Sequence, residues 1–424
     1  MNVLVIGSGG REHAIIQKLA ESPKVTRLFA YPGNGGMAGQ AVCIPGNVKD
    51  IPALVQAARD CRADFVVVAP DDPLVLGAVD ALHAAGFPCF GPDAKAAAIE
   101  GSKVFSKDLM RKYRIPTAEY RVFDDAARAL AYLADAPIPI VVKADGLALG
   151  KGALVCMTRQ EALDAVHSMM EDKVFGESGS RVVIEEFMEG PEVSVLSFTD
   201  GRTVVPMVSS MDHKRARDGD QGLNTGGMGT VAPNPYYTPE IAQECMDTIF
   251  LPTIRAMQAE GRPFKGCLYF GLMLTKNGPK VIEYNCRFGD PETQVVLPLL
   301  KSDLLEVMQA VEEERLAGCP VEFSDRHACC VVLASDGYPQ KYETGFPITV
   351  DDGFTGRLYC AGVKRSADNI PVTAGGRVLG VAAVGDTLRQ AVDEAYRQAA
   401  KVHFENAYCR KDIGRRALAA GEEN

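Results

Sequence analysis

The segment IVVKADGLALGKGALVC, residues 140–156, carries the strongest indication of the fold in this 424-residue sequence. An apolar run ends at Lys143, a glycine-rich stretch follows, and a second apolar run begins at Ala153. We predict two antiparallel strands whose connecting loop closes over a nucleotide as a lid, with its backbone amides facing the phosphates. The segment is not a Walker A loop, because Gly152 follows Lys151 where serine or threonine is required. The alternative is an ordinary hairpin with solvated lysines.

Length and composition indicate a multidomain globular protein. A chain of 424 residues is too long for one ordinary core, so we expect two or three domains. The net charge of −10 argues against a general nucleic-acid binder, which needs a basic field. No apolar run reaches about 18 residues and no basic leader precedes the first strand, so we expect neither a membrane span nor a signal peptide. Twelve cysteines without a C-x-x-C pair indicate reduced thiols in a cytoplasmic protein, and the six histidines show no zinc spacing.

Strand and helix patterns alternate over the first hundred residues. This alternation predicts a parallel sheet with crossover helices. The expected strands are 3–7, 26–31, 65–69 and 88–91, and the expected helices are 11–21, 51–60 and 73–85. Two further helical segments end at a proline before residue 117, with a domain joint near residue 100.

The rest of the chain reads as antiparallel strands with fewer helices. The expected strands are 138–143, 153–156, 181–187, 192–199, 203–209, 266–275 and 280–285, followed by 329–334, 356–363 and 377–384. Thr158 and Glu161 form a capping-box pattern, and Thr238 is the expected N-cap of a long helix that begins at Pro239. Asn277-Gly278 suits a tight hairpin turn. The strands from residue 328 and a helix at 387–401 predict a separate α+β unit.

The opening VIGSGGREHA places glycines between the first strand and the first helix. Backbone N–H groups at such a helix start can face an anion. A dinucleotide site is weakened because Glu12 replaces the third fingerprint glycine and no acidic residue ends the second strand near Tyr31. The phosphate of another ligand is favoured over a nicotinamide cofactor, and plain strand–helix packing is the structural alternative.

The segment VVIEEFMEGPEVSV ends a strand with two carboxylates, Glu185 and Glu186. With Phe187 and Met188 behind them, they resemble a hinge where an adenine edge meets backbone groups. Glu192, a few residues further, is placed to hold ribose hydroxyls. A surface strand with solvated glutamates is the alternative reading of this segment.

The segment KVIEYNCRFGDPETQ places Glu283 and Asn285 two residues apart on a strand, so both side chains leave the same face. A carboxylate and an amide oxygen suit Mg²⁺, which takes its remaining ligands from phosphate and water. Arg287 continues this face and can bind a carboxylate or phosphate through two hydrogen bonds. A solvated strand is the alternative.

The segment SMDHKRARDGDQGLNTGGMG mixes charges around Asp212, Lys214 and Arg215 before a glycine turn at 225–229. The amides of that turn can cradle a second anion. A mobile surface loop has a similar composition and is the competing interpretation.

In order along the chain, ten motifs together resemble the glycinamide ribonucleotide synthetase family of the ATP-grasp superfamily. They are GSGGREHA, PGNGG, GPDAKAAAIEGSK, IPTAEY, KADGLALGKG, VIEEFMEG, DHKR, NTGGMG, NCRFGDPETQ and CRKDIG. The resemblance implies an α/β domain at 1–101, an ATP-grasp domain at 102–325 with a lid at about 120–190, and an α+β domain at 326–424. It also implies an ATP-dependent ligase of purine synthesis that joins glycine to 5-phosphoribosylamine through glycyl phosphate.

The resemblance assigns roles to the matching residues. ATP would be bound by Lys103, Lys143, Gly150, Lys151, Gly152, Glu185, Glu186, Phe187, Met188, Glu192 and Lys214, and Mg²⁺ or Mn²⁺ by Glu283 and Asn285. Catalysis would rest on Arg287, Lys143 and Asp212, with Arg287 steadying the acyl phosphate and Asp212 taking the glycine ammonium. The substrates would be bound by Gly9, Gly10, Arg11, Glu12, Gly33, Asn34, Asp71, Thr225, Gly227, Met228 and Arg287.

One position departs from the family pattern at a site of expected contact. Asp71, in APDDPL, stands where the family usually has glutamate, so its contact with the sugar phosphate would need a water bridge or help from Asp72. Three other functions compete with the one implied: a different ATP-grasp carboxylate–amine ligase, an NAD-dependent oxidoreductase and a non-catalytic nucleotide sensor. We expect a monomer that acts on small molecules without nucleic acid or membrane partners.

Overall fold

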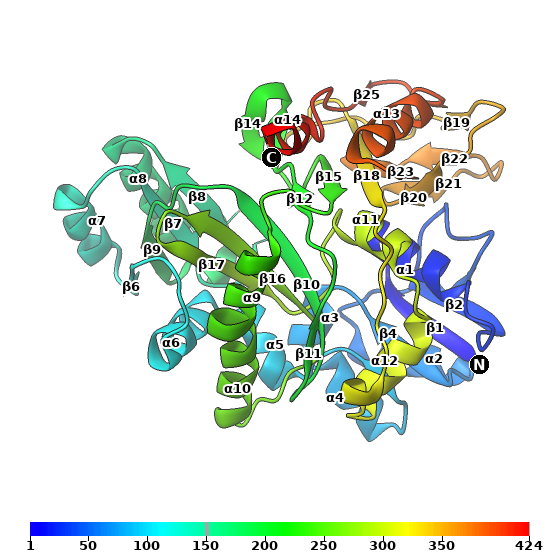
Figure 1. Ribbon diagram of the computed structural model, residues 1–424, viewed down its shortest axis with the longest axis horizontal. Coiled ribbons are helices and arrows are strands. Elements are labelled where there is room, and N and C mark those ends of the chain that lie inside the picture. Colours follow the sequence, from blue (N-terminus) through cyan, green and yellow to red (C-terminus); the bar gives the residue numbers. More distant parts are fainter. Residues whose placement is uncertain (149–151, 424) are drawn as a thin grey trace.

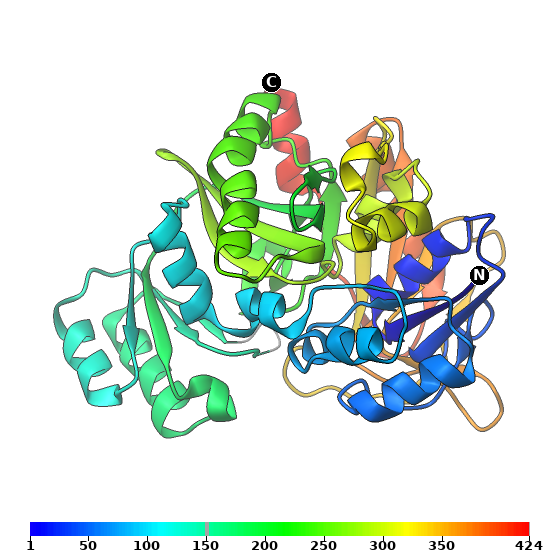
Figure 2. The ribbon, with the colours of Figure 1, turned by 90° about the horizontal axis from the view of Figure 1, so that it is seen from below.

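The computed structural model describes residues 1–148 and 152–423. Figure 1 shows three masses around a central sheet: an N-terminal part, a projecting lid and a C-terminal part. In the same molecule turned by 90°, the lid helices α7 (Ala126–Asp135) and α8 (Arg159–Val166) stay apart from the N-terminal part (Figure 2). Among the described residues no helix is both long and apolar enough to cross a membrane.

The N-terminal part is the predicted parallel sheet, with strand order β3-β2-β1-β4-β5. Its strands are β1 (Asn2–Gly7), β2 (Arg27–Pro32), β3 (Val42–Cys43), β4 (Phe65–Val68) and β5 (Cys89–Phe90). Its helices are α1 (Gly10–Leu19), α2 (Ile51–Asp60), α3 (Asp71–Val75), α4 (Ala78–Ala84) and α5 (Ala94–Gly101). Every residue of β4 is buried, as expected of a parallel strand with both faces covered. The order reverses direction between β1 and β4, which makes this the switch point where such sheets bind ligands.

One helix prediction in this part was wrong. The segment 73–85 was expected to be a single helix, but it forms α3 and α4 with a break at Gly77. Gly77 has a φ of 85°, a left-handed conformation that a continuous right-handed helix excludes. The break leaves Asp71 in the first turn of α3, directly after the carboxyl end of β4.

The lid is an antiparallel sheet of order β6-β9-β7-β8 covered by α7 and α8. Its strands are β6 (Tyr120–Phe123), β7 (Ile140–Ala144), β8 (Ala153–Cys156) and β9 (Val182–Glu186). The paired strands β7 and β8 flank the glycine-rich loop as predicted, and Thr158 and Glu161 form the predicted capping box of α8. The lid has its own apolar core, built on residues such as Leu133, Val142 and Ile184.

The body behind the lid is a second antiparallel sheet of order β11-β10-β16-β17. Its strands are β10 (Glu192–Asp200), β11 (Val204–Pro206), β16 (Lys265–Thr275) and β17 (Gly278–Asn285), and its helices are α6 (Lys103–Tyr113), α9 (Pro239–Cys245), α10 (Leu251–Ala259), α11 (Thr293–Val296) and α12 (Leu304–Glu312). The predicted hairpin turn is confirmed, because Gly278 follows Asn277 with a φ of 97°. The predicted cap of α9 is also confirmed, since the Thr238 side chain accepts a hydrogen bond from the N–H of Ile241.

The C-terminal sheet contains strands from two distant parts of the chain. Its order is β12-β15-β18-β23-β20, with β25 also paired to β18. The strands are β12 (Met211–Asp212), β15 (Gly229–Ala232), β18 (His327–Ser335), β20 (Arg357–Cys360), β23 (Arg377–Gly385) and β25 (Ala407–Tyr408). The predicted boundary at residue 326 therefore does not coincide with a sheet boundary. The segment around 211–232 is anchored in the same sheet as the C-terminal strands.

The remaining strands and α-helices lie outside this sheet. They are the strand pairs β13 (Arg215–Arg217) with β14 (Gln221–Asn224), β19 (Thr349–Val350) with β24 (Val402–His403) and β21 (Val363–Arg365) with β22 (Pro371–Thr373), and the helices α13 (Leu388–Ala399) and α14 (Arg415–Glu423). In Figure 1, α14 lies beside β14. The N–H of Gly219 donates to Asp412 Oδ2 at 2.8 Å and ties these two regions together.

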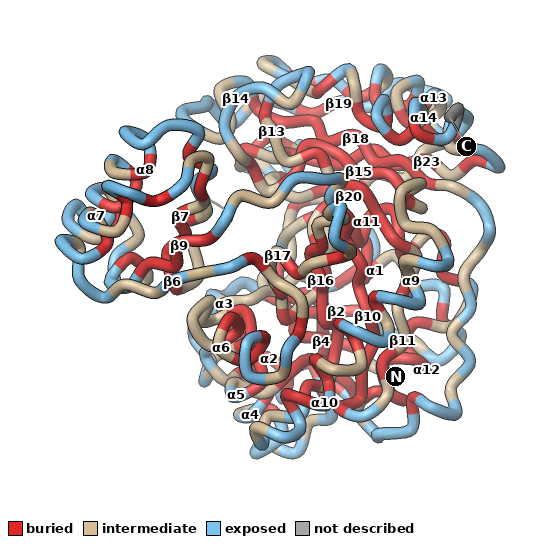
Figure 3. Tube along the Cα trace, turned by 60° about the vertical axis from the view of Figure 1, so that its left-hand side comes forward, coloured by how far each residue is buried: buried red, intermediate tan, exposed pale blue. Residues whose placement is uncertain are grey.

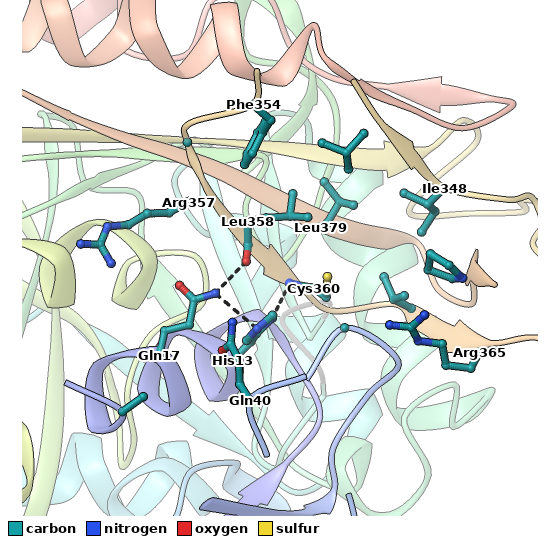
Figure 4. A pocket seen from close by; sticks show the side chains of 16 residues that line it. His13, Gln17, Gln40, Ile348, Phe354, Arg357, Leu358, Cys360, Arg365 and Leu379 are labelled. Carbon is teal, nitrogen blue, oxygen red and sulfur yellow. Dashed lines mark hydrogen bonds between the residues drawn. The ribbon is translucent and has the colours of Figure 1, made fainter. Parts of the chain in front are cut away.

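Two buried histidines make hydrogen bonds to the C-terminal part: His13 connects it to α1, and His213 connects segments within it. His13 on α1 lies under β20 beside a cavity of about 670 Å³ (Figure 4), and its Nδ1 accepts a hydrogen bond from the N–H of Cys360 at 2.8 Å. His213 donates from Nδ1 to Gly229 O at 3.1 Å and accepts from the N–H of Gly414 at Nε2 at 3.2 Å. Protonating either ring would place a new N–H against an existing donor.

These contacts predict an acid-sensitive fold. Burial is the main cause that lowers the pKa of both His13 and His213 to about 4, against about 6.5 in an unfolded chain. The unfolded chain therefore binds more protons between pH 6.5 and 4, and stability is lost as the pH falls through this window. Each histidine accounts for up to about 3 kcal/mol. The unfolding midpoint should fall steeply as the pH is lowered from 7.5 to 5. In His13→Gln the midpoint should depend less on pH. The same pH dependence in this variant and in the native protein would contradict the prediction.

Candidate active site

A cleft of about 850 Å³ lies between the lid sheet and the body sheet. Its walls come from α6, from the lid strands β7 and β9, from β16 and β17, and from the 211–226 segment. Figure 3 shows the lid as a separate unit with buried strands of its own, opposite the buried strands of the body. Most of the charged side chains singled out in the sequence line this cleft. Gly150 and Lys151 lie outside the described residues.

Two lysines and a glutamate form a buried group of charges on the lid side of the cleft. The Nζ of Lys143 lies 2.9 Å from Glu185 Oε2 and donates to Ile282 O at 3.1 Å. The Nζ of Lys107 lies 3.2 Å from Glu185 Oε1. Burial lowers the pKa of Lys107 to about 8, although the carboxylate of Glu185 acts in the opposite direction. Glu185 is therefore not the solvated residue of the alternative reading, since it is buried and forms ion pairs with both lysines.

Replacing Glu185 should destabilise the protein by leaving these two lysines without a counter-charge. Breaking a buried ion pair at one partner costs about 3–5 kcal/mol. Glu185→Gln should therefore lower the free energy of unfolding in urea by about that amount at pH 7.5. The matched control is Glu186→Gln, because Glu186 pairs with Lys280 at 2.8 Å on the surface, where such a pair contributes about 0–1 kcal/mol. Equal losses in the two variants would contradict the buried-pair interpretation.

Lys103 and Asp145 connect α6 with the glycine-rich loop. Lys103 Nζ donates to Gly146 O at 3.0 Å, and burial lowers the pKa of this lysine. The Asp145 carboxylate accepts from the N–H of Val104 at 2.8 Å and from Arg181 at 2.5 Å. Sequence reasoning missed Asp145 and Lys107. The spacing of Lys107 four residues after Lys103, on one face of a helix, was the available signal for the lysine.

The predicted hinge connects the lid to the body. Glu186, Phe187, Met188 and Glu192 all line the cleft, as does Gly152 at the far end of the loop. Lys214 Nζ lies 3.5 Å from Glu192 Oε2 and 3.8 Å from Glu283 Oε1. Lys214 is thus placed between the two predicted carboxylate ligands of the nucleotide and its metal.

Glu283 and Asn285 lie near the end of β17 and both line the cleft. Burial alone would raise the pKa of Glu283, but the charges of Lys214, Lys143 and Lys103 lower it below its ordinary value. The group is therefore an ionised carboxylate at neutral pH. Within the described part of the chain, no group of three or more His, Cys, Asp or Glu residues is arranged to hold a metal ion. The pair offers a cation two protein oxygens and leaves its other positions to phosphate and water, as Mg²⁺ sites commonly do.

Arg287 lies between two carboxylates at the base of the cleft. Its Nη2 lies 2.9 Å from Glu100 Oε1 and 3.9 Å from Asp71 Oδ2. Its Nε is buried and has no hydrogen-bond partner among the described residues. Glu100 also accepts a hydrogen bond from the N–H of Cys286 at 2.7 Å. No role for Glu100 was predicted from the sequence, although it lies in the motif GPDAKAAAIEGSK, because α5 meets β17 only in the folded chain.

Asp212 is a carboxylate with a buried oxygen, and it lies near other charged side chains. Its Oδ1 is buried without a hydrogen-bond partner in the described residues. Burial, together with the nearby charge of Glu292, raises the pKa of Asp212 well above its ordinary value. A buried carboxylate oxygen with no donor is suited to receive a cationic group from a ligand.

The predicted substrate residues of the N-terminal part meet at the switch point of its sheet. Arg11 and Asp71 line the cleft from the carboxyl ends of β1 and β4. The cleft lining does not include Gly9, Gly10, Gly33 and Asn34. The Asn34 side chain donates to Ser8 O at 2.8 Å and to Cys360 O at 2.7 Å.

Two acidic residues near this point face away from the cleft. Glu12 is buried, accepts from the N–H of Gly9 at 2.6 Å and from Arg11 at 2.7 Å, and so caps its own helix. Asp72 pairs with Lys49 at 2.9 Å and does not share the position of Asp71.

The Thr225–Met228 turn is held against the strand that carries Asp212. Thr225 Oγ1 donates to Lys214 O at 2.8 Å, and the N–H of Met228 donates to His213 O at 2.8 Å. The N–H of Gly227 donates to Thr225 Oγ1 at 3.0 Å. Thr225 and Gly226 line the cleft and residues 227–229 are buried, whereas residues 217–219 and 221–223 of the same segment are exposed.

Three family models match the chain: phosphoribosylglycinamide synthetase N domain (residues 1–100), ATP-grasp (A) domain (101–293) and C domain (328–416). The phosphoribosylamine–glycine ligase of Escherichia coli is 48% identical over 424 residues, with 99% of each chain covered. That of Clostridium acetobutylicum is 46% identical, with 98% of this chain and 100% of the relative covered.

Two solved structures extend the comparison. The phosphoribosylamine–glycine ligase of Thermotoga maritima matches with a TM-score of 0.85 and 33% identity, over 97% of this chain and 100% of that one. The biotin carboxylase of Campylobacter jejuni matches with a TM-score of 0.74 at 14% identity, over 96% of this chain and 92% of that one. At that identity the second likeness shows the fold alone.

Proposed function

The chain belongs to the phosphoribosylglycinamide synthetase family, and we propose that its reaction takes place in the cleft between lid and body with the residues described above. The chain is a C–N ligase that joins glycine to 5-phosphoribosylamine at the expense of ATP and gives glycinamide ribonucleotide, ADP and phosphate. This is a step of purine synthesis. The observation that carries the proposal is the convergence of Lys103, Lys143, Glu283 and Arg287 on one cleft.

We assign the lid end of the cleft to ATP. Lys103 and Lys143 would meet the phosphates, and the hinge from Glu185 to Met188 would line the adenine, with Glu192 at the ribose. Lys143 is already fixed by Glu185, so it offers a positioned charge and loses little freedom when a phosphate arrives. Gly150 and Lys151, which lie outside the described residues, are assigned to ATP by the sequence resemblance alone.

Glu283 and Asn285 fit a divalent cation, Mg²⁺ or Mn²⁺. Glu283 is ionised, and in the described part of the chain the Asn285 side chain makes no hydrogen bond that would occupy its oxygen. Such a cation, when bound, neutralises charge on the phosphate oxygens. Lys214 lies 3.8 Å from Glu283 and would keep that carboxylate ionised and oriented.

The proposed chemistry has two steps. The glycine carboxylate attacks the γ-phosphate to form glycyl phosphate and release ADP; the amine of phosphoribosylamine then attacks the acyl carbon, and phosphate leaves. Arg287 would stabilise the charge on the acyl phosphate by a guanidinium positioned beforehand by Glu100. Asp212 would hold the glycine ammonium. No side chain acts as a nucleophile, so positioning and charge stabilisation provide the rate enhancement.

We assign phosphoribosylamine to the switch point of the N-terminal sheet. Arg11 and Asp71 would contact its ribose phosphate, with Gly9, Gly10, Gly33 and Asn34 behind them and the turn of Thr225, Gly227 and Met228 opposite. Glu12 would act by capping α1 and holding Arg11. We further propose that the chain acts as a monomer on these small-molecule substrates. The cysteine usage supports a cytoplasmic location.

The decisive test is ADP release measured with each substrate omitted in turn. We expect ADP to form rapidly only when ATP, glycine and phosphoribosylamine are all present, with glycinamide ribonucleotide as the product. ADP release that ignored glycine and followed another carboxylic acid would overturn the assignment of the acid substrate. ATP binding without turnover of any acid would favour a nucleotide sensor.

A further inference from the structure

Arg377 reaches from the C-terminal sheet into the cleft of the ATP-grasp part. It is the first residue of β23 and follows Gly375 and Gly376. Its side chain is only about one-fifth exposed and lines the cleft with Tyr338 of the same domain. No motif in the sequence pointed to this arginine.

The Arg377 guanidinium joins two segments that belong to the proposed substrate site. Its Nη1 donates to Gly226 O at 2.7 Å and to Asp290 O at 2.8 Å. Its Nη2 lies 3.1 Å from Asp290 Oδ2. One planar group therefore holds the Thr225–Met228 turn and the loop after β17 at a fixed separation.

The fit around this guanidinium is close. A Cβ atom at Gly226 would lie 2.9 Å from the Arg377 Cζ and 3.0 Å from its Nη2. A larger residue at position 226 would therefore have to displace the guanidinium from its present position. A lysine ammonium at position 377 would be a single point of charge and could not reproduce the fork of donors.

Asp290 connects Arg377 to the N-terminal part, because its carboxylate lies next to the start of α1. Its Oδ1 accepts from Gln294 Nε2 at 2.6 Å, and a Cβ atom at Gly10 would lie 3.4 Å from the same oxygen. Burial alone would raise the pKa of Asp290, but the charges of Arg377 and Arg11 lower it, so the carboxylate is ionised. Asp290 thus lies between Arg377 and the first turn of α1, next to the proposed phosphoribosylamine site.

We propose that Arg377 is a positioning residue for the amine substrate. It sets the Thr225–Met228 turn and Asp290 against the start of α1, so that phosphoribosylamine is held in line with the acyl phosphate. The C-terminal domain thereby completes the second half of the reaction while leaving the nucleotide end untouched. This inference rests on the function proposed above.

Comparing two amines in the second half-reaction distinguishes this positioning role from a general loss of structure. Hydroxylamine, a small amine that needs no ribose phosphate site, can attack glycyl phosphate to give glycine hydroxamate and phosphate. Arg377→Met should lower kcat/KM for phosphoribosylamine at least tenfold, chiefly through KM, and change hydroxamate formation from ATP and glycine less than threefold. The kcat/KM of Arg377→Lys for phosphoribosylamine should lie between the values for Arg377→Met and the native protein. If Arg377→Met affects both amines equally, or neither, the proposal is wrong.

The matched control is Arg357→Met. Arg357 also connects the C-terminal sheet to the N-terminal part, through Glu21 at 3.7 Å, but it lies at the other cavity (Figure 4) and away from the cleft. It should leave kcat/KM for phosphoribosylamine unchanged. If Arg377→Met does not fold, the two amines are compared in Arg377→Lys instead. An equal loss of activity with phosphoribosylamine and with hydroxylamine would contradict the proposal. Failure of the native protein to use phosphoribosylamine would instead overturn the proposed function itself.

Discussion

Glu283→Ala should lower kcat by about a thousandfold or more while the protein stays folded. Glu283 is the charged member of the oxygen pair proposed for the cation, and its neighbours Lys103, Lys143 and Lys214 keep it ionised. Without it, a cation would keep only the neutral Asn285 as a protein ligand. The three lysines would also face one another with less compensating charge, which further disturbs the position of the phosphates.

The measurement is steady-state ADP release at saturating ATP and glycine with Mg²⁺ and with Mn²⁺, alongside the unfolding midpoint. Glu244→Ala is the matched control, because Glu244 is an exposed glutamate on α9 outside the cleft. It should leave the rate unchanged. Near-native turnover of Glu283→Ala with either cation would remove the metal assignment.

Arg287→Lys should lower kcat by about tenfold to a hundredfold, although the positive charge is kept. The guanidinium of Arg287 contacts Glu100 through Nη2 and still has its Nε free of any partner in the described residues. It can therefore stay anchored and bind an acyl phosphate at the same time. A lysine ammonium that kept the contact with Glu100 would turn its charge away from the substrate.

Lysine is preferred to alanine in this test because it keeps a counter-charge beside Glu100. Removing the charge altogether would leave a buried carboxylate unpaired and would confound catalysis with stability. The expected loss lies in kcat and in kcat/KM for glycine, with little change in the KM for ATP. A native kcat in the lysine variant would mean that Arg287 only supports the structure around Glu100 and Asp71.

Local features were predicted well because neighbouring residues determine them. The hairpin at Asn277-Gly278 needs one residue with positive φ, and the capping box of α8 needs only Thr158 and Glu161. The single helix expected at 73–85 failed for a similarly local reason, since the left-handed Gly77 divides it. The candidate metal pair followed from the period of a strand, which places Glu283 and Asn285 on one face.

Features of the site that depend on distant segments were not predicted. Glu185 neutralises Lys143 from 42 residues away, and Glu100 holds Arg287 from 187 residues away. Nothing in the local pattern around either glutamate distinguishes it from a solvated one. The pairing of β15 with β18, and of β12 with β15, likewise joins residues about 210–232 to a C-terminal sheet that begins nearly a hundred residues later.

The sequence by itself determined the types of element, their order, the family and the chemical groups available for the reaction. These follow from backbone preferences, hydrophobic period and motif spacing, all of which act over a few neighbouring residues. The tertiary structure alone decided which charges are buried together, which carboxylates stay ionised and that Arg377 joins the cleft. Those outcomes depend on desolvation and on Coulomb interactions between segments that meet only when the sheets pack.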